Sequence, residues 1–182
     1  QKLNVQNLND GVLLIIWGLF KKVVVADNVA VFVDTYYGSA AHQNGGFLVF
    51  ATYLFAIQIY CDFSGYSDMA IGISKMLGME LKINFKTPYF STSISQFWRN
   101  WHISLSNWMK DYVYLPLGGN KKGKIHTSFN LVVTMLIGGF WHGANWTFII
   151  WGGINGFFLS LEKLFGRTRN QSPFIIRLFK GV

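Results

Sequence analysis

A histidine, His142, lies near the middle of residues 125–161, a stretch of 37 residues without Asp, Glu, Lys or Arg. About 20 apolar residues suffice to cross a bilayer, so this stretch is long enough for two passes. An ionisable side chain at membrane depth is costly and usually faces a protein interior or a water-filled cavity. We therefore expect His142 to be a functional centre, with its neutral imidazole acting as a general base. The alternative is a structural histidine that hydrogen-bonds a neighbouring helix.

A second histidine, His102, lies within an amphipathic pattern over residues 94–112. Apolar and aromatic residues recur there at spacings of three and four, which predicts one face of a helix, whereas Arg99, His102, Ser106 and Lys110 fall on a different face. Such a helix could lie at the membrane interface or line a polar cavity. A histidine on such a helix is more often interfacial than catalytic, and the nearby serines form no strong Ser–His motif.

Other residue types that could do chemistry form no strong pattern. Asp62 and Asp68 could act as paired carboxylates, but helix capping or pairing with Arg99 is the commoner role. The sequence contains no metal-ligand spacing of any strength, and its single cysteine, Cys61, rules out an internal disulfide. We therefore expect neither a metal nor a tightly bound cofactor.

The composition is that of an integral membrane protein. Hydrophobic residues make up 51% of the chain and charged residues only 13%, against roughly 25% in ordinary soluble domains. The net charge of +8 is concentrated in short clusters between apolar segments. This arrangement favours attraction to anionic membrane lipids over binding of nucleic acid.

The elements that must position the histidines are predicted to be helices. Residues 11–33 should form a short tilted or interfacial helix, whose lysines snorkel to water, and then a second short segment. Residues 47–79 should form two helices that meet at a polar break at 62–68. Loops are expected at 38–46, 80–93 and 118–124, the last two facing the cytoplasm, and a juxtamembrane tail at 162–182.

Four ordered motifs carry a resemblance to a known family. They are YCDFSGYSD at 60–68, FWRNWHISLS at 97–106, DYVYLPLGGN at 111–120 and GFWHGANW at 139–146. Together they resemble the membrane-bound O-acyltransferase (MBOAT) family, and within it the bacterial branch of alginate O-acetylation proteins. Lipoteichoic acid D-alanyl transfer proteins are similar around both histidines, but the motif at 111–120 looks more like the polysaccharide-acetylating branch.

The resemblance implies an all-α, polytopic integral membrane fold. Transmembrane, re-entrant and amphipathic interfacial helices would surround a central tunnel. Family members are considerably longer, so residues 1–182 would be a partial transmembrane domain, the middle to C-terminal part of a longer chain. The protein would be a multi-pass protein of the bacterial plasma (inner) membrane.

The resemblance also implies an activity. An acyl group, with acetyl favoured, would pass from a donor such as acetyl-CoA across the membrane towards a cell-surface or exported polysaccharide. His142 matches the family's principal catalytic histidine, and His102 matches the second histidine, which would orient the partners or stabilise the oxyanion. Arg99, Asn100 and Asn145 are weaker candidates for substrate binding. Implied partners are membrane lipids, a separate extracytoplasmic acetyltransferase and exopolysaccharide machinery.

Two other functions fit the residues themselves. A proton-coupled transporter or lipid-linked glycan flippase would use His142 in a proton relay and form no acyl ester. A non-catalytic scaffold for exopolysaccharide enzymes would tolerate replacement of both histidines.

Overall fold

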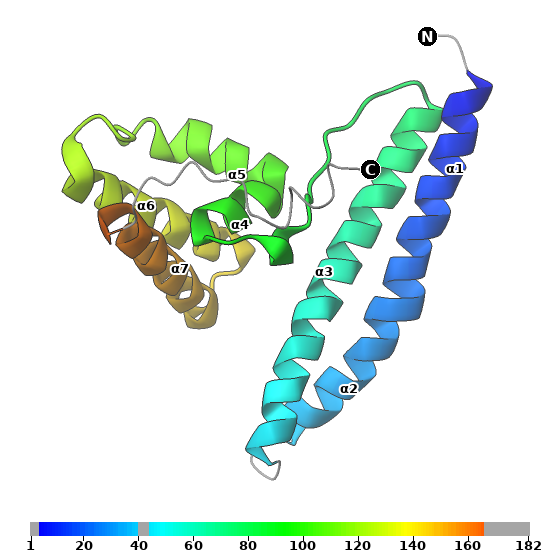
Figure 1. The fold of residues 1–182 in the computed structure, drawn as a ribbon, viewed down its shortest axis with the longest axis horizontal. Helices are drawn as coiled ribbons and strands as arrows, with labels where there is room; N and C mark the ends of the chain where they lie inside the picture. The colour runs from blue at the N-terminus through cyan, green and yellow to red at the C-terminus, as the bar shows by residue number, and fades with distance from the viewer. Residues whose placement is uncertain (1–3, 40–43, 166–182) are drawn as a thin grey trace, which may run out of the picture. The chain divides into compact units, whose positions relative to one another are not determined.

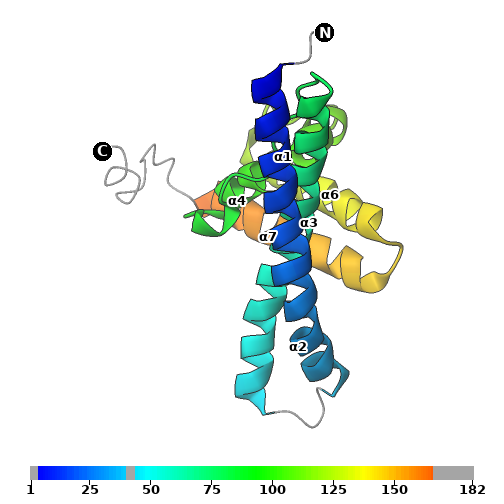
Figure 2. The same cartoon turned by 90° about the vertical axis from the view of Figure 1, so that its right-hand side faces the viewer.

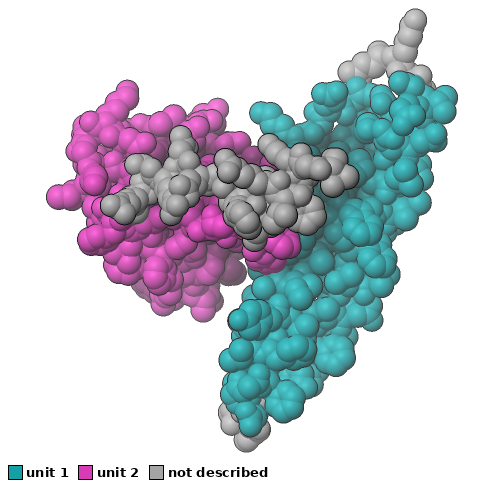
Figure 3. All heavy atoms as spheres, viewed as in Figure 1, with its two compact units in different colours: residues 1–84 teal, residues 85–182 magenta. Residues whose placement is uncertain are grey.

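The computed structural model describes residues 4–39 and 44–165, and these residues form helices, turns and loops without any strand. The chain divides into two compact units, residues 1–84 and 85–182, which are coloured separately in Figure 3. The all-α fold predicted from the sequence is confirmed for the described residues.

The first unit is a long helical hairpin. Helix α1 (Val5–Leu19) continues without a break through the π-helix η1 (Phe20–Ala26) into α2 (Asp27–Gly38). Helix α3 (Gly45–Met76) runs beside this composite helix for 32 residues, as Figures 1 and 2 both show. The predicted polar break at 62–68 is wrong, because α3 passes through these residues as one continuous helix.

Small residues let the two arms of the hairpin touch through their backbones. A Cβ atom added at Gly18 would lie under 3.0 Å from the carbonyl oxygen of Gly65, and one at Gly65 would meet that of Gly18 in the same way. Gly11 and Gly72 form a second reciprocal pair. This is the close packing that small residues permit between membrane helices.

Ion pairs explain why α3 carries aspartates without breaking. The ammonium of Lys21 lies 2.5 Å from a carboxylate oxygen of Asp68, and that of Lys22 lies 2.6 Å from one of Asp62. The expectation that these aspartates cap helices is therefore wrong, because both lie inside α3 and pair with the lysines of η1. Lys21 also donates a hydrogen bond to the hydroxyl of Ser64 at 3.1 Å, so polar groups of both arms satisfy one another.

The second unit is a set of shorter helices followed by a helix pair. Its elements are η3 (Pro88–Phe90), α4 (Ile94–Asn100), α5 (Ile103–Met109), the π-helix η4 (Lys110–Tyr114), α6 (Gly123–His142) and α7 (Trp146–Phe165). The single helix predicted over 94–112 is wrong, because the chain breaks between α4 and α5 at Trp101 and His102. The predicted loops at 80–93 and 118–124 are largely confirmed, with η3 inside the first and the start of α6 at the end of the second.

Helices α6 and α7 lie side by side (Figures 1 and 2), and their backbones touch at three glycines. A Cβ atom at Gly139 would overlap the Phe148 carbonyl, and one at Gly152 would overlap that of Met135. A Cβ atom at Gly156 would lie 2.8 Å from the Cα of Val132. The two helices therefore form an antiparallel pair that needs glycine at each of these three positions.

Two helices among the described residues, α3 and α7, are long and apolar enough to cross a membrane. The charge-free stretch at 125–161 folds as the pair α6 and α7, of which α7 is a candidate span. The predicted loop at 38–46 is confirmed in part, since α2 ends at Gly38 and α3 begins at Gly45, with residues 40–43 outside the described chain. The predicted tail at 162–182 lies mostly outside it, and residues 162–165 belong to α7.

We expect Lys21→Met to lower the free energy of unfolding by about 2–4 kcal/mol, because Asp68 loses its partner at a largely buried site. The double variant Lys21→Met/Asp68→Asn should recover most of this loss, since it leaves no unpaired charge. Thermal unfolding of the whole protein in detergent measures both changes, with the exposed Lys82→Met as control. Equal losses in the single and double variants would contradict the assigned ion pair.

Gly152→Ala should destabilise the protein by about 1–3 kcal/mol, because its methyl group would overlap the Met135 carbonyl and force α6 and α7 apart. The neighbouring Gly153→Ala is a matched control, since its Cβ would meet only the Leu136 side chain at an ordinary 3.5 Å. Heat denaturation in detergent compares the two variants. The same loss in both would show that this backbone contact is not what limits stability.

Candidate functional site

A cavity of about 500 Å³ lies within the second unit. Its wall combines aromatic and apolar side chains with a small number of polar and cationic ones, as small-molecule sites usually do. Residues from α4, α5, η4, α6 and α7 contribute, and they include Trp98, Arg99, Ser106, Lys110, Tyr114, Thr134, Met135, His142, Trp151 and Lys163.

His142 lies in the wall of this cavity, as its predicted role requires. It is the last residue of α6, and the helix ends at Gly143. Its ring packs edge-on against Trp151 of α7 at 5.5 Å and lies 6.3 Å from the ring of Phe148. A Cβ atom at Gly143 would lie 2.8 Å from the Phe148 ring, so glycine there leaves room for the aromatic contact. Within this chain His142 is exposed, and so its imidazole is accessible to a substrate.

His102 occupies the break between α4 and α5 and is half-buried. Its backbone is left-handed, with φ 42 and ψ 56, an uncommon conformation for a residue with a side chain. The residue is outside the cavity wall, but its ring lies 6.4 Å from that of Trp141, whose ring lies 5.1 Å from His142. Burial lowers the pKa of His102, and the nearby charge of His142 lowers it further, so both effects favour the neutral imidazole.

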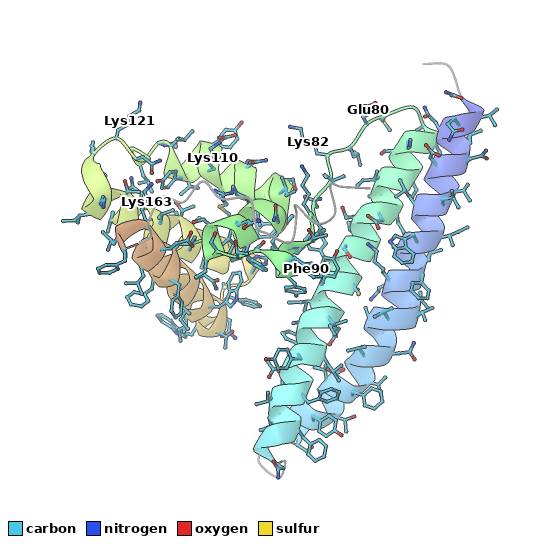
Figure 4. The ribbon with its side chains drawn as sticks, in the orientation of Figure 1. Glu80, Lys82, Phe90, Lys110, Lys121 and Lys163 are labelled. Atoms are coloured by element: carbon cyan, nitrogen blue, oxygen red, sulfur yellow. The ribbon has the colours of Figure 1, made fainter. Side chains whose placement is uncertain are left out.

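The cavity gathers three cationic side chains: Arg99, Lys110 and Lys163. Figure 4 labels Lys110 and Lys163, which come from η4 and α7. Asp111 is the one acidic partner that the described residues provide for them, 3.9 Å from the Lys110 ammonium. Arg99 was predicted as a weak substrate-binding residue, whereas Lys163 was missed because it follows an apolar helix and resembles a juxtamembrane anchor. Such a set of cations can bind an anionic group of a substrate.

The structure places the other two predicted substrate-binding residues outside the cavity wall. Asn100 donates a side-chain hydrogen bond to the Ser91 hydroxyl at 3.3 Å. The side-chain oxygen of Asn145 accepts from the backbone N–H of Thr147 at 3.1 Å, which is the geometry of a residue that caps a helix, here α7. The described residues contain no cluster of three side chains that could hold a metal ion.

Comparison of the sequence with known proteins shows the family to which the chain belongs. The model of the membrane-bound O-acyltransferase family, MBOAT, matches residues 1–178. "Probable alginate O-acetylase AlgI" from Pseudomonas putida is 49% identical over 157 residues, which are 86% of this chain and 32% of the relative.

More distant bacterial proteins match the same region. "Peptidoglycan O-acetyltransferase" from Helicobacter pylori is 44% identical over 174 residues, 96% of this chain and 33% of the relative. "Teichoic acid D-alanyltransferase" from Streptococcus thermophilus is 34% identical over 124 residues, 64% of this chain and 30% of the relative. The chain thus spans about a third of the length of these curated relatives. Matched over nearly its whole length, the chain belongs to the membrane-bound O-acyltransferase family.

Proposed function

We propose that the whole protein is a membrane-embedded O-acyltransferase that moves an acyl group across the membrane for O-acetylation of a cell-surface or exported polysaccharide. The observation that carries the proposal is the position of His142, an accessible imidazole in the wall of a largely apolar cavity of about 500 Å³. Family membership supports the same reaction class.

The relatives favour acetyl as the acyl group. Two of them are named for O-acetylation, of alginate and of peptidoglycan, and they are 49% and 44% identical to this chain. The relative named for D-alanyl transfer is 34% identical. We therefore infer that the acyl group is acetyl. Because alginate and peptidoglycan are both glycans, we also infer that the acceptor is an exported glycan.

Two cavity residues, His142 and Arg99, and the neighbouring His102 can be assigned roles in an acyl transfer. The imidazole of His142 would take the proton of the attacking hydroxyl as its oxygen bonds to the acyl carbon of a thioester. The carbon–sulfur bond then breaks, and the thiolate leaves with the proton that the imidazole returns. His102 would orient the partners or donate a hydrogen bond to the developing oxyanion, and Arg99 would hold an anionic part of the donor.

The remaining parts of the proposal concern the whole protein. Acetyl-CoA would be the donor, used as a substrate and not as a bound cofactor. The helices would enclose a tunnel in the bacterial inner membrane, with re-entrant and amphipathic helices at its ends. A separate extracytoplasmic acetyltransferase and exopolysaccharide machinery would receive the acyl group. Membrane lipids would cover the apolar faces of α3 and α7, which expose large side chains such as Phe50 and Ile154.

In cells that express the whole protein, His142→Ala should reduce the O-acetyl content of the surface glycan to background, because the general base is lost. Membrane abundance should be unchanged, since the side chain is exposed and removing it opens no buried cavity. Ester content after mild alkaline release is the measurement. The matched control is His126→Gln at the opposite end of α6, which should retain full acetylation. Equal ester in His142→Ala and the wild type would bring the transporter or scaffold alternatives forward.

A further inference from the structure

The break that presents His102 is a strained feature that requires support. Helix α4 ends at Asn100, Trp101 is extended, and His102 is left-handed before α5 begins at Ile103. A left-handed residue with a Cβ atom persists only where surrounding contacts hold it there. The contacts around the break therefore identify the residues on which the position of His102 depends.

Ser106 bonds both peptide groups that flank His102. Its hydroxyl donates to the carbonyl oxygen of Trp101 at 3.0 Å. Its backbone N–H donates to the carbonyl oxygen of His102 at 2.9 Å. The second bond is ordinary for a helix, but the hydroxyl bond reaches back across the break to a carbonyl that α5 cannot satisfy through its own backbone.

The other side of the break is fixed by the segment at 85–91. The backbone N–H of Lys86 donates to the carbonyl oxygen of Asn100 at 3.0 Å, and the Phe85 ring packs edge-on against Trp101 at 5.1 Å. Asn100 in turn donates to Ser91. With the residues before His102 held in this way, the Ser106 hydroxyl adds a side-chain hydrogen bond from α5 to the carbonyl that precedes His102, beside the helical bond of its own backbone N–H.

We propose that Ser106 is a positioning residue for His102: its hydroxyl holds the left-handed break and so keeps the His102 imidazole beside Trp141, next to His142. The consequence for acyl transfer rests on the proposed function, whereas the positioning of His102 does not. Ser106 also lies in the cavity wall, so direct contact of its hydroxyl with a donor is the competing role.

The chemical reactivity of His102 tests the positioning directly. Diethyl pyrocarbonate modifies accessible histidines, and peptide mass spectrometry of the whole protein in detergent gives a rate for each one. In Ser106→Ala, His102 should react about threefold faster or more, because loss of one hydrogen bond frees the break. Ser106→Thr, which keeps the hydroxyl, should restore the wild-type rate. The rates of His126 and His142 should not change.

A matched control is Ser128→Ala, which removes a buried hydroxyl that has no hydrogen-bond partner among the described residues. It should leave the reactivity of His102 unchanged. Equal His102 rates in Ser106→Ala and Ser128→Ala would overturn the proposal. An increase at all three histidines would also overturn it, because Ser106 would then support the fold in general.

Kinetics separate positioning from donor binding. In membrane vesicles supplied with acetyl-CoA, Ser106→Ala should lower kcat about tenfold with KM unchanged, and Ser106→Thr should recover the activity. A raised KM with unchanged kcat would assign the hydroxyl to the donor and overturn the positioning role. If His142→Ala acetylates normally, the proposed function fails, and the reactivity of His102 still decides the role of Ser106.

Discussion

The candidate site depends on the backbone contact between α6 and α7. At Gly139, Gly152 and Gly156 the two helices approach so closely that a single added methyl group would overlap the partner helix. This approach sets the rotation of α6 about its own axis. One face of that helix then turns Thr134, Met135 and His142 towards the cavity, and Trp151 of α7 closes against the His142 ring. A helix pair held apart by ordinary side chains would leave His142 without this aromatic neighbour.

The wall of the cavity suits a substrate that carries both an apolar and an anionic group. Trp98 and Trp151 pack edge-on at 5.7 Å and give the wall an aromatic surface that can hold a small acyl group. Arg99, Lys110 and Lys163 provide positive charge in the same cavity. In the proposed reaction the imidazole would move a proton while the cations hold the rest of the substrate. In the hairpin of the first unit, by contrast, the charged residues pair with each other: Lys21 and Asp68 form an ion pair between apolar helices.

Part of this arrangement could be predicted from the sequence. His142 was identified from its place in a charge-free stretch, and it lies in the cavity wall. Arg99, a weaker candidate for substrate binding under the family resemblance, lies in the same wall. The break at His102 could not be predicted from the sequence, because the helical periodicity of apolar residues continues across it. The contacts that hold His102 in its left-handed conformation come from other segments, such as 85–91. The continuity of α3 was missed for a similar reason. Its aspartates look like a helix break until the partner lysines of η1 are known.

Photo-cross-linking tests the central claim, that this cavity receives the acyl donor beside His142. A short-chain acyl-CoA with a diazirine in its acyl group would be irradiated with the whole protein in membranes, and labelled residues mapped by mass spectrometry. We expect label on cavity residues such as Met135, Trp151 and Leu159, and its loss when excess acetyl-CoA competes. Label that falls only on α1 and α3, or that acetyl-CoA does not displace, would contradict the account.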